Sequence, residues 1–303
     1  MRKLLLFFID GLGIGSADST KNPMIDLFTG ITGGTRIAEI TSSVRFPGGI
    51  IIPTDAVMGV EGIPQSATGQ TSIFTGVNAQ KLLGFHLPAY PNDVLKSTIE
   101  EKSLMKKLAD SGVSVTSANL YSDEFFEKRI RPGQNMMPAS TLTIQAARSK
   151  FRFPEDYAIG KAVFADITNE LIRKRGYDIP LLKPERAARH MLNILDDHDF
   201  VFFEYFMTDL HGHKQNREKL IECVATLNSF TSRLWEKVDR KQTAMLIVSD
   251  HGNCEDISIG DHTMNAVPTI LFSEKENEIV LFEKSVKKLT DIYRAVCGFF
   301  NGS

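Results

Sequence analysis

The chain has 303 residues, of which 42% are hydrophobic and 24% are charged, an ordinary composition for a folded globular protein. Its 35 basic and 37 acidic residues give a net charge of −2, so electrostatics favour neither nucleic acid nor an anionic membrane as a partner. The three cysteines, none in a Cys-x-x-Cys pair, argue against a disulfide framework and indicate a reducing compartment. We therefore expect a cytoplasmic protein.

Largely apolar runs that end at an aspartate recur along the chain. The three runs comprise residues 3–9 before Asp10, 200–208 before Asp209 and 244–248 before Asp250. Runs of this length bounded by polar residues are typical of strands buried on both faces. The first is too short for a signal peptide, and no run approaches the roughly 20 apolar residues of a membrane helix. We predict three buried strands and no membrane partner.

A hydroxyl side chain follows a predicted helix start at Pro64. Ser66 lies at the cap or in the first turn, among free backbone N–H groups at the positive end of the helix dipole. Such a site stabilises phosphate oxygens and also an alkoxide. Ser66 is therefore the candidate nucleophile, and Thr68 is the second candidate. A plain helix cap is the structural alternative for Ser66.

Further helices and strands alternate along the chain. Helical periodicity covers residues 103–110, 158–175, 185–195, 216–238 and 283–297, and strand patterns cover residues 50–52, 113–118 and 267–272. This alternation predicts an α/β fold with a mostly parallel central sheet and helices on both faces. No linker or repeat divides the chain, so we predict a single domain over residues 1–303.

Two segments lack clear periodicity and are expected to be irregular loops. Residues 77–98 combine aromatic residues with prolines and could form one wall of a substrate pocket or could equally cover the core. Residues 119–156 carry a basic cluster, in which Arg129 and Arg131 could bind a phosphate oxygen of the substrate. Solvated surface is the alternative for both arginines. Together the two segments could form a reduced cap.

Carboxylates and imidazoles gather at the ends of the predicted strands, which is where open α/β sheets bind ligands. Asp and His together are ligands that zinc and manganese accept. Six ligands are too many for one tetrahedral ion, so we expect two divalent metal ions. One site would use Asp209, His213 and His262, with His211 as a competing ligand, and the other would use Asp10, Asp250, His251 and Ser66.

Two metals close together can share an in-line phosphoryl displacement. One would lower the pKa of the Ser66 hydroxyl, and the other would stabilise the leaving oxygen, while the helix start would hold the non-bridging oxygens. This arrangement predicts a covalent phosphoserine and chemistry in two steps.

These motifs resemble those of the alkaline phosphatase superfamily, and most closely the branch containing cofactor-independent phosphoglycerate mutase and phosphopentomutase. The matching segments, in the family order, are residues 8–11, 66–69, 209–213, 249–253 and 262–268. The resemblance implies Ser66 as the phosphorylated nucleophile and manganese or zinc as the metals. The chain departs from those mutases in two ways. Little room for a full cap domain is left between Ser66 and Asp209, and Gly69-Gln70 stands where they tend to have Gly-His.

We therefore expect a two-metal phosphomonoester hydrolase that acts on a small intracellular phosphate ester. A phosphomutase of the phosphoglycerate or pentose phosphate type is the first alternative, because both reactions begin with phosphoryl transfer to Ser66. A metal-binding module without turnover is the alternative from another class of protein, and phosphodiesterase activity is compatible with the same scaffold. Free phosphate as a product indicates the hydrolase, and an isomerised ester indicates the mutase.

Overall fold

A seven-stranded sheet lies at the centre of the computed structural model, which describes residues 2–131 and 134–302, without the side chains of residues 131, 134 and 135. Its strands, in spatial order, are β2 (Val44–Phe46), β3 (Gly49–Thr54), β9 (Val267–Phe272), β8 (Thr243–Val248), β1 (Lys3–Ile9), β7 (Phe200–Tyr205) and β4 (Val115–Ser117). β8, β1, β7 and β4 run parallel to one another. The other three pairs are antiparallel: β9 with β8, β3 with β9, and β2 with β3. A separate hairpin pairs β5 (Ile130–Arg131) with β6 (Gln134–Asn135).

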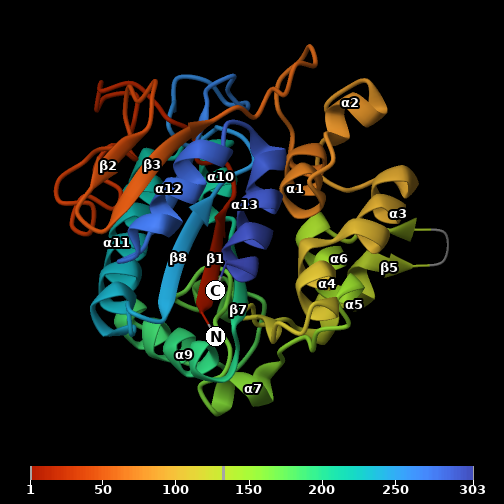
Figure 1. The fold of residues 1–303 in the computed structure, drawn as a ribbon. Helices are drawn as coiled ribbons and strands as arrows, with labels where there is room; N and C mark the ends of the chain where they lie inside the picture. Colours follow the sequence, from red (N-terminus) through yellow and green to blue (C-terminus); the bar gives the residue numbers. More distant parts are fainter. Residues whose placement is uncertain (1, 132–133, 303) are drawn as a thin grey trace.

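Helices cover both faces of the sheet, as Figure 1 shows. They are α1 (Ser66–Thr75), α2 (Ala79–Leu83), α3 (Asp93–Lys102), α4 (Leu104–Asp110), α5 (Asp123–Arg129), α6 (Ala139–Ala146), α7 (Pro154–Ala158), α8 (Glu170–Lys174), α9 (Pro184–Asp197), α10 (Met207–Gly212), α11 (Arg217–Lys237), α12 (Glu276–Ser285) and α13 (Leu289–Asn301). One apolar cluster joins the sheet to α9 and α11, and a second joins it to α1, α12 and α13. The predicted α/β fold with helices on both faces is confirmed.

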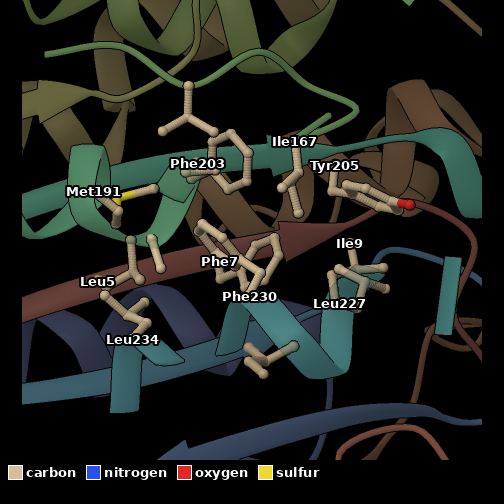
Figure 2. Packing of buried hydrophobic residues seen from close by; sticks show 14 of the residues in the cluster. Leu5, Phe7, Ile9, Ile167, Met191, Phe203, Tyr205, Leu227, Phe230 and Leu234 are labelled. Atoms are coloured by element: carbon tan, nitrogen blue, oxygen red, sulfur yellow. The ribbon is translucent and has the colours of Figure 1, made fainter. Parts of the chain in front are cut away.

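The central strand β1 is apolar throughout because each of its faces packs against a different cluster of helices. Phe7 on β1 meets Phe203 on β7 with ring centroids 5.3 Å apart and Phe230 on α11 at 5.8 Å (Figure 2). On the opposite face, Phe8 meets Phe74 of α1 at 5.9 Å. Burial on both faces explains why the strand reads as a continuous apolar run rather than an alternating one.

The carboxyl ends of β1, β7 and β8 meet at one edge of the sheet, because the three strands are parallel and adjacent. Asp10 and Asp250 follow β1 and β8 at this edge, and Asp209 follows β7 within the short helix α10. Strand β9 runs antiparallel to β8, so its beginning lies at the same edge. His262, which precedes β9, therefore joins the residues that follow the parallel strands.

The predicted helix over residues 158–175 is wrong. Residues 159–169 form turns, and the only regular helix begins at α8. The Asp166 carboxylate accepts hydrogen bonds from the backbone N–H groups of Asn169 and Leu171 at 2.7 and 2.6 Å. These local side-chain bonds replace the helical ones, and Asn169 itself has a φ of +67°.

Three further predicted segments differ from the structure. The predicted helix 283–297 is interrupted between α12 and α13, where the Asp291 carboxylate accepts hydrogen bonds from the backbone N–H groups of Lys287 and Lys288, both at 3.1 Å. The segments 77–98 and 119–156, expected to be irregular, contain helices or their beginnings. Asn78, Asn92 and Ser122 cap α2, α3 and α5 with their side-chain oxygens.

Candidate active site

Ser66 is the first residue of α1, and its hydroxyl faces the edge of the sheet. The N-cap residue Gln65 gives no side-chain hydrogen bond, and the first backbone bond of the helix runs from Gly69 N–H to Gln65 O at 2.8 Å. The N–H groups before Gly69 therefore lack helical partners. Ser66 Oγ lies 3.0 Å from His251 Nε2. The alternative nucleophile Thr68 is fully buried, and its hydroxyl donates back to Gln65 O at 3.1 Å.

Two buried aspartates flank the same imidazole. His251 Nε2 lies 3.3 Å from Asp10 Oδ1 and 3.5 Å from Asp250 Oδ2. Both of these carboxylate oxygens are buried and have no hydrogen-bond partner among the described residues. The Asp250 carboxylate is held by the backbone N–H of His251 at 3.1 Å and that of Gly11 at 3.5 Å. Asp10, Asp250 and His251 can thus direct ligand atoms to one point.

A second carboxylate–imidazole group adjoins the first. Asp209 Oδ2 lies 3.5 Å from His213 Nε2, four residues along the helical turn, and Asp209 Oδ1 lies 3.5 Å from His262 Nε2. Asn253 donates to Asp209 Oδ1 at 2.7 Å and fixes that carboxylate. The rings of His262 and His251 stack with centroids 3.6 Å apart, so the two groups are continuous.

The orientation of the imidazoles fits a bound cation. The Nδ1 atoms of His213 and His262 lie 3.2 Å from Gly260 O and 2.8 Å from Pro64 O. A carbonyl accepts only, so each Nδ1 carries the proton and each Nε2 presents a lone pair. The two Nε2 atoms lie 3.1 Å apart, where two lone pairs repel unless they share a proton or a cation. Carbonyl-bonded imidazoles are the usual ligand state at metal sites.

Crowded negative charge dominates the electrostatics of this edge. Burial, with the Asp250 and Asp209 carboxylates, raises the pKa of Asp10 to about 7, and burial raises the pKa of Asp250 to about 6. Burial opposes the charged form of His251, but the Asp250 and Asp10 carboxylates raise its pKa to about 10. A divalent metal bound here would offset the charge of the carboxylates and would take the place of a proton on the His251 imidazole.

A cavity of about 390 Å³ opens beside Ser66, Asp10 and Asp209. Arg129 lines it, with its guanidinium 4.7 Å from the centroid of Phe125 and its Nη1 donating to Tyr90 Oη at 2.6 Å. Tyr90, from the segment 77–98, lines this cavity. The side chain of Arg131 lies outside the described residues. His211 does not line this cavity, and its Nδ1 has no partner in the described part of the chain.

Two glutamates at this edge, one buried and one half-buried, were missed by the sequence reasoning. Glu255 is 1% exposed and binds the loops that follow β1 and β8. Glu204 stands inside the otherwise apolar strand β7 and lines the cavity. A charged residue within a buried strand was the available signal for Glu204. For Glu255 the signal was its position shortly after the Asp250-His251-Gly252 motif.

Comparison with known proteins agrees with this architecture. Residues 170–302 match the model of the Metalloenzyme superfamily. The chain is 30% identical over 124 residues to a 2,3-bisphosphoglycerate-independent phosphoglycerate mutase of Clostridium novyi (strain NT), covering 37% of this chain and 24% of that protein. It is 22% identical over 293 residues to the protein of the same name from Pyrococcus abyssi (strain GE5 / Orsay), covering 87% of this chain and 70% of that protein. The chain thus spans about a quarter of the first relative's length.

Solved structures show the same fold at low sequence identity. The PH0037 protein from Pyrococcus horikoshii has a TM-score of 0.60 and 14% identity, covering 100% of this chain and 97% of that chain. The alkaline phosphatase from the Antarctic bacterium TAB5 has a TM-score of 0.52 and 11% identity, covering 99% and 98%. Residues 170–302 therefore resemble a metalloenzyme superfamily domain, and the chain has the alkaline-phosphatase-like fold. Within residues 2–131 and 134–302, no helix has the length and apolar character needed to cross a membrane.

Proposed function

We propose that the protein is a two-metal phosphoryl-transfer enzyme that hydrolyses a small phosphate monoester, with Ser66 as the nucleophile. The observation that carries this proposal is the position of Ser66 Oγ, 3.0 Å from His251 Nε2 at a helix start without a side-chain cap. The superfamily match and the phosphoglycerate mutase relatives support phosphoryl transfer as the class of reaction. The proposal places the reaction in the cytoplasm, as cysteine usage indicates.

The residues that would hold the metals form the two adjoining groups. Asp209, His213 and His262 would hold one ion, and Asp10, Asp250, His251 and Ser66 would hold the other. This set of oxygen and imidazole nitrogen ligands suits manganese and zinc. When bound, the ions supply positive charge that offsets the carboxylates, polarises phosphate and favours the ionised Ser66 hydroxyl.

The chain's own groups account for the bond changes. Attack by Ser66 Oγ forms an Oγ–P bond and breaks the bond between phosphorus and the ester oxygen, which leaves as an alcohol after taking up a proton. The backbone N–H groups in the first turn of α1 would bind the non-bridging oxygens. Attack by water then releases phosphate and restores Ser66.

Hydrolysis is preferred to phosphate transfer between positions of one substrate because the covering segments are small. The segments 77–98 and 119–156 contribute Tyr90, Phe125 and Arg129 to the cavity wall, and we propose that they serve as a reduced cap. Such a cap would leave water access to a phosphorylated Ser66. A phosphomutase is the second candidate, favoured by the names of the relatives.

The test is hydrolysis of p-nitrophenyl phosphate by protein stripped of metal and then refilled with manganese or zinc. Turnover that requires metal and disappears in Asp209→Ala, with the fold retained by circular dichroism, supports the proposal. Metal-independent turnover, or unchanged turnover in Asp209→Ala, contradicts it. Conversion of 3-phosphoglycerate or a pentose phosphate into its isomer, without free phosphate, would establish the mutase instead.

A further inference from the structure

Five aromatic side chains stand in the wall of the cavity beside Ser66. Tyr90, Tyr121, Phe125, Phe164 and Phe206 all line it. The Tyr121 and Phe125 rings pack edge to face with centroids 5.2 Å apart, which fixes this wall. A volume of about 390 Å³ lies at the small end of ligand-binding pockets. These walls fit one flat or ring-shaped group better than a short, fully hydrated chain.

Apart from Asp10 and Asp209, the proposed metal ligands, one carboxylate in the cavity wall has an oxygen that can bind a ligand. Glu204 Oε2 accepts a hydrogen bond from Ser140 Oγ at 2.8 Å. Glu204 Oε1 accepts no hydrogen bond from the described residues, and it is not fully buried. This oxygen therefore reaches the open space of the cavity. Asn119 binds both backbone groups of Glu204, each at 2.9 Å, and holds that part of β7 in place.

Three cationic side chains also line the cavity, those of Arg129, Arg175 and Lys214. Arg129 donates to Tyr90 Oη at 2.6 Å and to Met136 O at 3.3 Å, and its guanidinium lies over the Phe125 ring. These contacts hold Arg129 against the aromatic wall. Burial, followed by the Asp10 carboxylate, raises the pKa of Glu204 to about 7. In either protonation state, Glu204 can hydrogen-bond a hydroxyl or an amino group.

Resting on the proposed phosphatase function, we propose that the alcohol portion of the substrate is a ring that carries a hydroxyl or amino group bound by Glu204. The phosphate would sit at Ser66, the ring would lie between the aromatic walls, and its polar substituent would meet Glu204 Oε1. The aromatic wall therefore favours ring alcohols over phosphoglycerate, whose alcohol has no ring to pack against it.

The test compares two aryl phosphates with the manganese-loaded full-length protein. 4-Aminophenyl phosphate and 4-methylphenyl phosphate have similar size and leaving groups of similar basicity, but only the first has a hydrogen-bonding substituent. Losing one hydrogen bond to a carboxyl group such as that of Glu204 lowers kcat/KM about 10- to 100-fold. We expect kcat/KM to be higher for the amino compound by that factor. We also expect 3-phosphoglycerate, added as a competitive inhibitor, to bind more weakly than either aryl phosphate.

Variants of Glu204 show whether this residue sets the preference. Glu204→Gln keeps the side-chain shape and should reduce the preference several-fold, and Glu204→Leu should bring the ratio close to one. Glu236→Gln, on the exposed face of α11, is the matched control and should keep the wild-type ratio. A wild-type ratio within about twofold of one, or a ratio that both Glu204 variants retain, overturns the inference.

A binding measurement separates this inference from the proposed function. Calorimetry with Ser66→Ala and manganese measures the affinity of both esters without turnover. Tighter binding of the amino ester that is lost when Glu204→Leu is added to Ser66→Ala supports the pocket assignment. If the wild type hydrolyses neither ester, the phosphatase proposal is refuted, but this binding result still supports the role of Glu204. Hydrolysis of both esters at equal efficiency and equal binding would keep the phosphatase and refute the role of Glu204.

Discussion

Glu255 is the residue on which the geometry of the metal-ligating loops depends. Its Oε2 accepts hydrogen bonds from the backbone N–H groups of Gly13 at 3.0 Å and Asn253 at 2.7 Å, while Oε1 accepts from the Thr263 hydroxyl at 2.5 Å. These partners lie in the loops that follow β1 and β8 and in the loop that precedes β9. One buried carboxylate thus ties together the segments that carry Asp10, His251 and His262.

Glu255→Gln replaces one acceptor with a donor that would face donors. We expect it to destabilise the protein by about 1–3 kcal/mol, because buried donors lose their partner, and to weaken metal binding. Urea unfolding and a manganese titration measure the two effects. Glu222→Gln, at an exposed glutamate that pairs with Lys219, is the control and should change neither. Unchanged stability and unchanged affinity in Glu255→Gln would show that these hydrogen bonds do not organise the site.

At the scale of elements, the start of α1 must lie directly against the loop after β8. A Cβ built on Gly69 would lie 2.8 Å from Asp250 O and 2.9 Å from Asp250 Cβ. Only a residue without a side chain allows this approach, and the approach brings Ser66 Oγ to His251.

Gly69→Ala should therefore push the first turn of α1 away from Asp250. We expect a loss of about 1–3 kcal/mol of stability from overpacking, together with at least about a tenfold loss of phosphatase activity from misplacing Ser66. Gly298→Ala in α13 is the matched control, because its added Cβ would meet only Leu281 side-chain atoms, at 3.5 Å. The control should leave activity intact and gain up to about 1 kcal/mol of stability. Equal activity of both variants would contradict this account of α1.

The elements that the sequence predicts well are those with a continuous apolar run or a regular apolar face. The apolar run of β1 and the apolar periodicity of α11 reflect which side chains each element buries in the core. The local sequence pattern is therefore sufficient to predict both elements. The turns at residues 159–169 depend on Asp166 binding two particular backbone N–H groups, which no periodicity encodes. The same limit applies to the site. Strand ends bring the aspartates together, but the contacts of Glu204 and Glu255 arise from residues far away in the chain.

At the scale of the whole molecule, the fold encloses unpaired carboxylate oxygens of Asp10 and Asp250 at the edge of its central sheet. A cation bound there would offset the burial and the carboxylate repulsion that raise the pKa values of both groups. Ligands that bind only the folded state stabilise it, by about 2.7 kcal/mol at a concentration 100 times the Kd.

Metal should therefore raise the melting temperature of the protein. We expect excess manganese or zinc to raise Tm by about 5 °C or more relative to chelator-treated protein, by the usual scaling for a chain of this size. Differential scanning calorimetry provides the measurement. Asp250→Asn should have a smaller metal-dependent shift than the wild type. A Tm that is the same with metal and with chelator would contradict the assignment of these residues as metal ligands.

The central claim, that Ser66 accepts the phosphoryl group, is tested most directly by locating a covalent phosphate on the protein. Manganese-loaded enzyme would be mixed with 4-aminophenyl phosphate, quenched in acid within milliseconds and digested for mass spectrometry. Phosphate is expected on Ser66 in the wild type, and neither phosphoenzyme nor turnover is expected in Ser66→Ala. Phosphate on Thr68 or another residue, or turnover by Ser66→Ala at the wild-type rate, would contradict it.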